Sequence, residues 1–248
     1  MLESGSTVKL RSRADQNADP VIELRGVEKH YLMGDFLVKA LKGIDLKIFP
    51  GDYISILGPS GCGKSTMLNI LGCLDQPTVG EYFLDGVDVA QLTDDDLSSV
   101  RGKKLGFIFQ SYNLIQQLSV VENIEVPLYY QGVHEDESRV IAVELAKKVG
   151  LGKRLDHKPT ELSGGQQQRV AIARALSNDP SVILADEATG NLDSKSGSDI
   201  LQIFDDLNAE GKTLIMITHD EEMAKRTPRV IRLKDGEIGY DTYLHGDK

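Results

Sequence analysis

Nine consecutive residues form a glycine-rich loop whose composition suits the binding of a phosphate chain. They are Gly58, Pro59, Ser60, Gly61, Cys62, Gly63, Lys64, Ser65 and Thr66. The loop matches the pattern GxxxxGK followed by Ser or Thr, and it stands after an apolar run and before a helical pattern. Successive backbone N–H groups can surround an anion there, and the helix adds the positive end of its dipole. We expect Lys64 to reach the β- and γ-phosphates and Ser65 to ligate Mg²⁺; a chance lysine in a glycine-rich turn would lack this context.

Two adjacent carboxylates, Asp186 and Glu187, follow a run of small and apolar residues that begins at Ser181. Such a run predicts a buried strand. Asp186 is suited to hold Mg²⁺ directly or through water, because this ion keeps several waters and takes few carboxylates. Glu187 is suited to polarise the attacking water or to accept its proton. Two acids after a strand are by themselves a common start of a solvated loop, and the phosphate loop upstream favours the metal and base roles.

Gln110 and His219 are two further polar residues that directly follow predicted buried strands. In open parallel sheets, ligands bind outside the carboxyl ends of the strands. We therefore expect one edge of the sheet to collect Lys64, Gln110, Asp186, Glu187 and His219. Considered alone, His219 is better interpreted as a loop histidine with ordinary hydrogen bonds, so its candidacy rests on this convergence.

A second helix start, at residues 162–166, has the sequence Leu-Ser-Gly-Gly-Gln and opens an alanine-rich helical pattern. We call it the signature segment; its polar and glycine residues are Ser163, Gly164, Gly165 and Gln166. Ser163 is suited to cap the helix, whose N-terminus favours an anion. The phosphate loop already has a helix of its own, so this second terminus is spare within one chain. A simple N-cap is the alternative interpretation.

The runs between these motifs predict an α/β fold. Short β-like runs at the beginning of the chain predict an antiparallel region, at residues 21–24, 43–48 and 81–84. Compact apolar runs predict buried parallel strands at 53–57, 105–109, 181–185 and 213–218. Helical spacing of apolar residues predicts helices at 65–74, 137–149 and 194–208. The stretch of about seventy residues between the second and third strands exceeds one crossover, and it predicts an inserted helical subdomain at about 111–178.

Composition narrows the class of protein. The net charge of −10 argues against nucleic acid as a partner, and the two cysteines, Cys62 and Cys73, are too few for a secreted disulfide framework. No window approaches the ~18 apolar residues that a membrane span requires. Residues 1–20 are polar, so we expect a disordered leader without a signal peptide. If the protein acts at a membrane, we expect another chain to supply the membrane part.

The order of these motifs resembles the ABC ATPase family across about residues 21–240, and the signature segment is specific to that family. The resemblance implies a domain at 21–248 with a mainly parallel P-loop NTPase core, an N-terminal antiparallel β subdomain and an inserted α-helical subdomain. It also implies ATP and Mg²⁺ as cofactors, ATP hydrolysis, and a head-to-tail homodimer that holds two ATP molecules. The signature segment of one subunit would close over the γ-phosphate bound at Lys64 of the other.

The same resemblance assigns roles to single residues. Tyr31 matches the aromatic that lies under the adenine, and Asp193 matches a loop that faces the partner subunit. Gln110 would sense the γ-phosphate and metal, and His219 would contact the γ-phosphate. The chain departs from the family pattern at Ala188, where proline is usual, but no catalytic atom is lost.

Residues 67–78, 166–168 and 189–193 look like the subgroup that serves lipoprotein release, macrolide export and cell division. The resemblance implies a four-span permease with a large extracytoplasmic domain, and a peripheral position on the cytoplasmic face of the inner membrane. It favours export, lipoprotein release or mechanical signalling as the task. The alternative is a soluble or regulatory ABC ATPase without a cargo, such as a cell-division regulator.

The segment 111–128 is rich in apolar residues that fit two interpretations equally well. They are Tyr112, Leu114, Ile115, Leu118, Val120 and Val121. They either line a groove that receives a cytoplasmic helix of the permease or form part of the core of the helical subdomain.

Overall fold

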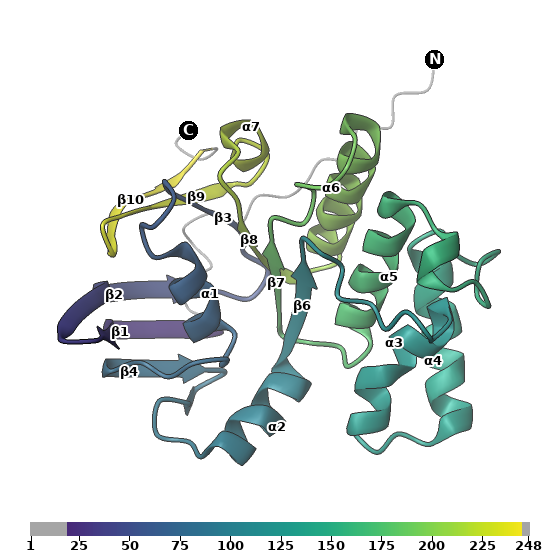
Figure 1. Ribbon diagram of the computed structural model, residues 1–248, viewed down its shortest axis with the longest axis horizontal. Helices are drawn as coiled ribbons and strands as arrows, with labels where there is room; N and C mark the ends of the chain where they lie inside the picture. Colours follow the sequence, from purple (N-terminus) through teal and green to yellow (C-terminus); the bar gives the residue numbers. More distant parts are fainter. Residues whose placement is uncertain (1–18, 245–248) are drawn as a thin grey trace.

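The computed structural model describes residues 19–244, so residues 1–18 of the predicted leader and the last four residues lie outside the described part. Two sheets and the helices packed around them make up this part (Figure 1). The first sheet is antiparallel, with the strand order β2-β1-β4-β5. Its strands are β1 (Ile22–Met33), β2 (Phe36–Ile48), β4 (Val79–Leu84) and β5 (Val87–Asp88).

The second sheet is the centre of the molecule, with the strand order β10-β9-β3-β8-β7-β6. Its five strands from β9 to β6 run parallel to one another, and β10 pairs antiparallel with β9. The strands are β3 (Tyr53–Leu57), β6 (Leu105–Phe109), β7 (Val182–Asp186), β8 (Thr213–Ile217), β9 (Arg229–Lys234) and β10 (Glu237–Tyr243). The predicted mainly parallel sheet is therefore confirmed.

The helices fall into groups by the strands that they connect. The first helix follows β3, the next precedes β6, three lie between β6 and β7, and the last two flank β8. They are α1 (Lys64–Leu71), α2 (Asp94–Lys104), α3 (Val120–Tyr130), α4 (Glu135–Lys148), α5 (Gly164–Leu176), α6 (Ser194–Ala209) and α7 (Glu221–Ala224), with a short 3₁₀ turn, η2 (Pro159–Glu161), before α5. Figure 1 places α3 to α5 together, on the opposite side of the central sheet from β1, β2 and β4.

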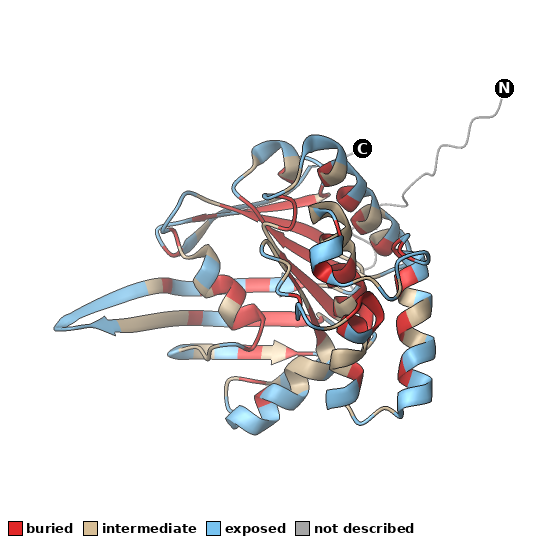
Figure 2. Ribbon diagram, turned by 45° about the vertical axis from the view of Figure 1, so that its right-hand side comes forward, coloured by how far each residue is buried: buried red, intermediate tan, exposed pale blue. Residues whose placement is uncertain are grey.

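The central sheet is buried on both faces, because alternate residues of its strands enter two different cores (Figure 2). Val182 and Leu184 of β7 pack with α1 and the antiparallel sheet, whereas Ile183 and Ala185 pack with α3 to α6. This explains why these strands read as continuous apolar runs rather than as alternating ones. Because both cores pack against the central sheet, they hold in place the carboxyl ends of its strands, where the site lies.

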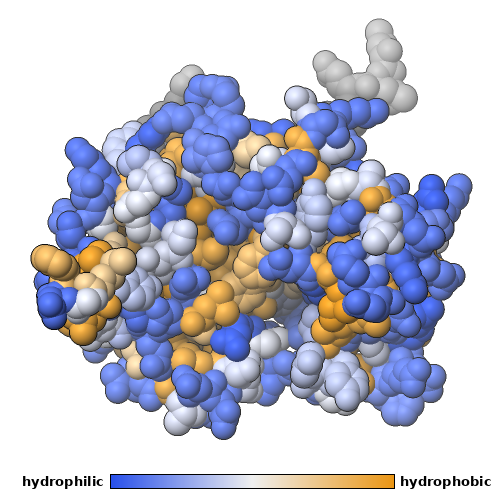
Figure 3. Space-filling view, in the orientation of Figure 1, coloured by the Kyte–Doolittle hydropathy of each residue, from blue (hydrophilic) through white to orange (hydrophobic). Residues whose placement is uncertain are grey.

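Several elements differ from the sequence predictions. The β2 strand begins at Phe36 rather than near residue 43, because its outer half is exposed and carries no buried apolar pattern. The helix α2 and the β9–β10 hairpin were not predicted, although Asp235 and Gly236 are a turn signal between two β-like runs. The helix α3 falls within the predicted helical subdomain, but its own bounds were not predicted. The tip of the β1–β2 hairpin projects large apolar side chains into solvent (Figure 3). They are Leu32, Met33, Phe36, Leu37 and Val38.

Candidate functional site

Four neighbouring strands of the central sheet end in the same row. Ile56 of β3 pairs with Ile217 of β8, Ile217 pairs with Asp186 of β7, and Asp186 pairs with Phe109 of β6. Within two residues of that row, the chain reaches the first glycine of the phosphate loop and three predicted site residues. The latter are Gln110, Glu187 and His219. The structure thus brings together at one edge the residues for which this convergence was predicted.

The phosphate loop leads into α1 without a side-chain cap. The N-cap of α1 is Gly63, in the left-handed region with φ 107°, and the first turn holds no acidic residue. A Cβ at this position would lie 2.7 Å from the Ala40 carbonyl oxygen, so the close approach also demands glycine. The Lys64 ammonium donates to the carbonyl oxygens of Gly58 (2.7 Å) and Pro59 (2.9 Å) across the mouth of the loop. A positive charge and the start of a helix therefore face the same space.

The two carboxylates at the end of β7 lie in different surroundings. Asp186 is half-buried, and this burial, together with the negative charge of Glu187, raises the pKa of its carboxyl group, an effect that the Lys64 charge partly offsets. Glu187 has left-handed backbone with φ 44°, which is uncommon for a residue other than glycine. Its Oε1 atom lies 2.6 Å from Nδ1 of His219. The strained backbone turns Glu187 away from the strand direction and toward the histidine.

Gln110 is tied to the loop that follows Glu187. Its Nε2 donates to Oδ1 of Asn191 at 3.1 Å, and Nδ2 of Asn191 donates back to the Gln110 carbonyl oxygen at 3.1 Å. Gln110, Glu187 and His219 line a cavity of about 430 Å³, together with Asp193. This cavity offers space for solvent or a ligand beside the carboxylates of Glu187 and Asp193.

Asp193 caps α6 with both of its carboxylate oxygens. They accept hydrogen bonds from the backbone of Lys195 (3.1 Å) and Ser196 (3.0 Å) and from the Ser196 hydroxyl (2.7 Å). The bonds from Ser196 lower the pKa of Asp193, which keeps the carboxyl ionised. The side chain also lines the cavity, so this acid serves α6 and faces the site at once.

The signature segment starts α5 with a capping box. The Gln166 backbone N–H donates to the Ser163 hydroxyl (3.3 Å), and the Ser163 N–H donates to Gln166 Oε1 (3.0 Å). A Cβ at Gly164 would lie 2.9 Å from the Tyr112 hydroxyl, and Gly165 lies beside Ser196 of α6. Within residues 19–244, no hydrogen bond joins this segment to the phosphate loop. The structure of one chain does not bring these two predicted groups together.

Tyr31 lies on β1, close to the end of the phosphate loop. Its hydroxyl donates to Oδ2 of Asp75 at 3.0 Å and interacts with Thr66; partial burial, followed by the Asp75 carboxylate, raises its pKa. The Lys29 ammonium lies 5.2 Å from the ring centre and also bonds Asp75 at 2.5 Å. Sequence reasoning gave Asp75 and Asn191 no role, because neither follows a predicted strand and only the folded chain brings them to the site.

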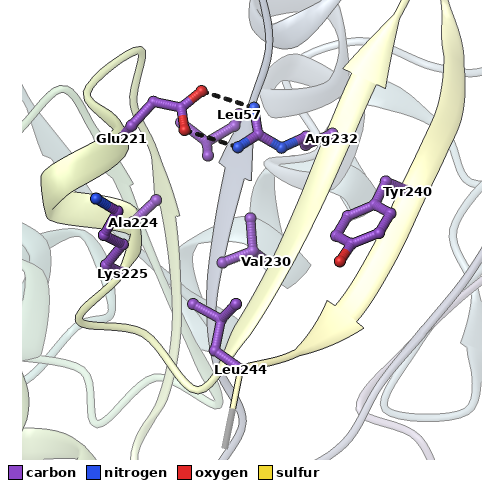
Figure 4. Close-up of a pocket in the computed structure, with 8 residues that line it drawn as sticks. All are labelled: Leu57, Glu221, Ala224, Lys225, Val230, Arg232, Tyr240 and Leu244. Atoms are coloured by element: carbon purple, nitrogen blue, oxygen red, sulfur yellow. Dashed lines mark hydrogen bonds and ion pairs between the residues drawn. The ribbon is translucent and has the colours of Figure 1, made fainter.

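A second hollow, of about 350 Å³, lies between α7 and the β9–β10 hairpin (Figure 4). Leu57, Ala224 and Val230 give it an apolar wall, and the Arg232 guanidinium binds both oxygens of Glu221 at 2.8 Å. That ion pair ties α7 to β9. None of the predicted site residues lines this hollow. Among the helices that the structure describes, none is long and apolar enough to cross a membrane.

Comparison with known proteins gives one consistent family. The family model described as ABC transporter matches residues 41–190. An uncharacterized ABC transporter ATP-binding protein of Thermotoga maritima is 52% identical over 218 residues, which are 88% of this chain and 93% of the relative. The macrolide export ATP-binding/permease protein MacB of Wolinella succinogenes is 53% identical over 219 residues. This alignment takes in 88% of the chain and 34% of MacB, so the chain spans about a third of that relative.

Two solved structures of MJ0796 are similar over their whole length. One is a dimeric post-hydrolysis state of this ATP-binding cassette bound to ADP and Pi, and the other is a dimeric structure of the same bacterial cassette. Both have a TM-score of 0.82, with 47% and 48% identity, and cover 91% of this chain. The predicted P-loop NTPase fold and the predicted resemblance to ABC ATPases of the macrolide-export type are confirmed. Because the family model covers more than half of the chain, and the Thermotoga maritima relative aligns over nearly its whole length, the chain belongs to the family of ABC transporter ATP-binding proteins.

Proposed function

We propose that this chain binds and hydrolyses ATP with Mg²⁺, and that two copies close head to tail over two ATP molecules. One observation carries the proposal: Lys64, Asp186, Glu187 and His219 gather at a single sheet edge, beside a helix whose N-terminus has no side-chain cap. The dimeric MJ0796 structure, which its description gives as bound to ADP and Pi, supports it. An anion at this edge meets a lysine and a helix dipole at once.

The donors at the edge fit Mg²⁺. Ser65 and Asp186 would hold the ion, with Gln110 nearby, and the ion would neutralise the charge on the phosphates when bound. Within residues 19–244, no three His, Cys, Asp or Glu side chains form a metal site by themselves. This suits an ion that keeps several waters and takes its other ligands from phosphates. The raised pKa of Asp186 fits the same role, because a divalent cation favours the ionised carboxylate that burial disfavours.

Glu187 is proposed to act as the general base, held in place by His219. The 2.6 Å contact between them orients the carboxylate, and His219 follows the end of β8 by two residues. A carboxylate held in this way can orient a water and accept its proton. His219 is exposed enough to turn toward a γ-phosphate when one is bound.

Glu187→Gln tests the base. Turnover is expected to fall by about 10²–10⁴-fold, because the amide cannot accept the proton, while ATP affinity is retained. With Mg-ATP the variant is expected to elute as a dimer in size-exclusion chromatography with light scattering. Glu210→Gln, an exposed glutamate at the end of α6, is the matched control and is expected to behave as wild type. An unchanged rate in Glu187→Gln would remove Glu187 from this role.

The signature segment and Asp193 are proposed to serve the partner subunit. In a head-to-tail dimer, Ser163 to Gln166 would close over the γ-phosphate held at Lys64 of the other copy. This gives a purpose to a helix start that no ligand site of its own chain uses. Tyr31 is proposed to lie under the adenine, because its hydroxyl contacts Thr66, where the phosphate loop ends.

We further propose that the dimer drives a separate permease with four spans and a large extracytoplasmic domain, from the cytoplasmic face of the inner membrane. The support is the similarity to the macrolide export ATP-binding/permease proteins MacB, which by their name combine an ATP-binding part with a permease. Export, lipoprotein release and mechanical signalling are the tasks that fit this arrangement. The apolar segment 111–128 divides between two environments: Leu114, Val120 and Val121 are buried in the core, whereas Ile115 is exposed.

The permease is tested by capturing tagged Glu187→Gln protein from detergent-solubilised native membranes with Mg-ATP, followed by mass spectrometry. A four-span protein with a large external domain is the expected partner. Ile115→Asp should weaken this capture while basal ATPase activity stays intact, whereas Leu114→Asp should unfold the helical core and is unsuitable. Recovery of soluble partners alone would favour a regulatory ATPase without a transport cargo.

A further inference from the structure

Gln168 is a buried polar residue of α5 that reaches the loop after the proposed general base. Its exposed fraction is 0%, and its Nε2 donates to the Ala188 carbonyl oxygen at 2.6 Å. Because a carbonyl oxygen can only accept, this contact fixes which end of the amide faces the loop. The other end, Oε1, is buried and has no hydrogen-bond partner within residues 19–244.

The contact joins two parts of the proposed machinery. The helix α5 begins in the signature segment, which is proposed to meet the ATP of the partner subunit. Ala188 directly follows Glu187, which is proposed to act on the ATP of its own subunit. A small displacement of α5 is therefore passed to the backbone next to Glu187, where φ is already 44° and the conformation is strained.

Other side chains of α5 contact different segments. Gln167 bonds the Leu162 carbonyl oxygen in its own helix start, and Arg169 bonds the Val149 carbonyl oxygen and Asp199. Within the described residues, Gln168 is the α5 side chain that hydrogen-bonds the segment 186–190. Among the described residues, α5 is therefore linked to the loop after Glu187 by one side-chain hydrogen bond, that of Gln168.

Stability of the fold does not account for a glutamine here. An apolar side chain of similar size would remove the unpaired Oε1 and would leave the Ala188 oxygen without this donor. One buried unpaired oxygen is exchanged for another, so the folded state is expected to change little. A residue that the fold does not require, placed between two sites, points to a role in coupling them.

We propose that Gln168 is a positioning residue that couples the two ATP sites of the dimer, so that closure of α5 on one site sets the geometry of Glu187 in the other. This inference rests on the proposed function, because it needs a dimer in which each chain contributes to both sites. The coupling is a free-energy link between sites, and its signature is cooperative hydrolysis.

Gln168→Met tests the coupling, because methionine keeps the length of the side chain and loses the donor. ATPase rates across ATP concentrations are expected to give a Hill coefficient above 1 for wild type and about 1 for the variant, with kcat roughly tenfold lower. The melting temperature and the affinity for a fluorescent ATP analogue are expected to stay at wild-type values. Gln202→Met is the control, since that amide bonds Asp206 of its own helix and no other residue that the structure describes. Gln168→Leu carries the same test if the methionine variant fails to fold.

Two results overturn the inference in distinguishable ways. If wild type is cooperative and Gln168→Met keeps both its Hill coefficient and its kcat, the coupling role of Gln168 is wrong and the proposed function stands. If Glu187→Gln forms no dimer with Mg-ATP and wild type shows no cooperativity, the proposed function fails and this inference fails with it.

Discussion

The helices α1 and α5 both begin in glycine-containing loops, but the N-terminus of α1 lacks a side-chain cap whereas that of α5 has one. The N-cap of α1 is a left-handed glycine without a side-chain hydrogen bond, and Lys64 is its first residue. The N-cap of α5 is Ser163, whose hydroxyl and whose backbone N–H are both engaged with Gln166. The first helix start is open to an anion as it stands. The second can offer its N–H groups and hydroxyl to a phosphate only after its own capping bonds loosen.

This difference indicates how one chain can hold a nucleotide before it meets a second copy. The bond from the Gln166 N–H to the Ser163 hydroxyl is long at 3.3 Å, so it is at the weak end of hydrogen bonding and inexpensive to exchange. A preformed site at α1 and a conditional site at α5 give an order to the proposed events: binding first, closure second.

The preformed site is broken by Lys64→Ala. Loss of the ammonium that faces the loop is expected to lower turnover by about 10²–10³-fold and to weaken ATP binding, because no other charge replaces it. Calorimetric titration of ATP and a coupled ATPase assay measure both effects. Lys47→Ala, an exposed lysine of β2 that pairs with Glu23, is the control. Normal affinity and rate in Lys64→Ala would mean that the α1 start is not the phosphate site.

The conditional site is broken by Ser163→Ala, and the effect should divide into two parts. Loss of the cap costs about 1 kcal/mol of stability, and loss of the hydroxyl at the γ-phosphate should lower turnover by roughly tenfold through impaired dimer closure. Thr93→Ala in α2 is a matched control, because that hydroxyl accepts a 3.3 Å bond from the Asp96 N–H in the same way. We expect both variants to lose the same amount of stability. Only Ser163→Ala is expected to lose turnover. Equal turnover in both variants would reduce Ser163 to an ordinary cap.

The comparison also shows what could be predicted from the sequence. The strands at 53–57 and 105–109 were predicted with their observed bounds, because buried parallel strands need continuous apolar runs and these runs end in turn residues. The gathering of Gln110, Glu187 and His219 at one edge followed from the parallel direction of their strands. Local pattern and topology were sufficient for these features.

The contacts that tune the site were not predictable in the same way. The hydrogen bond of Gln168 to Ala188 and that of Tyr31 to Asp75 join segments 20 and 44 residues apart, and their geometry depends on how whole elements pack. The outer half of β2 was missed because an exposed hairpin tip has no buried face to set a pattern. The β9–β10 hairpin does carry a local signal, because Asp235 and Gly236 form a turn between two β-like runs.

Substitutions at Tyr31 separate binding of the adenine from binding of the phosphates in the preformed site. Tyr31→Ala should raise the KM for ATP by about tenfold, the usual loss when a base loses an aromatic partner, and leave kcat nearly unchanged. Tyr31→Phe keeps the ring and loses only the contacts of the hydroxyl with Asp75 and Thr66, so a change of about two- to threefold is expected. Competitive inhibition by inorganic triphosphate should be the same in wild type and both variants. A weaker effect of triphosphate would place Tyr31 in phosphate binding instead.

Asp186→Asn should give the smallest effect, a gain of about 0.5–1 kcal/mol in the free energy of unfolding at pH 8 without nucleotide or Mg²⁺. Burial and the Glu187 charge raise the pKa of Asp186, so above that pKa the folded state holds a carboxylate that the unfolded state hydrates better. The gain should shrink as the pH falls and vanish below the ordinary aspartate pKa of about 3.9, where the carboxyl is neutral in both states. Urea unfolding between about pH 3 and pH 8 measures it, with Asp35→Asn, at an exposed position, as the control. Mg-ATP should reverse the order by stabilising wild type alone, and a gain that persists with Mg-ATP would argue against Asp186 as the metal ligand.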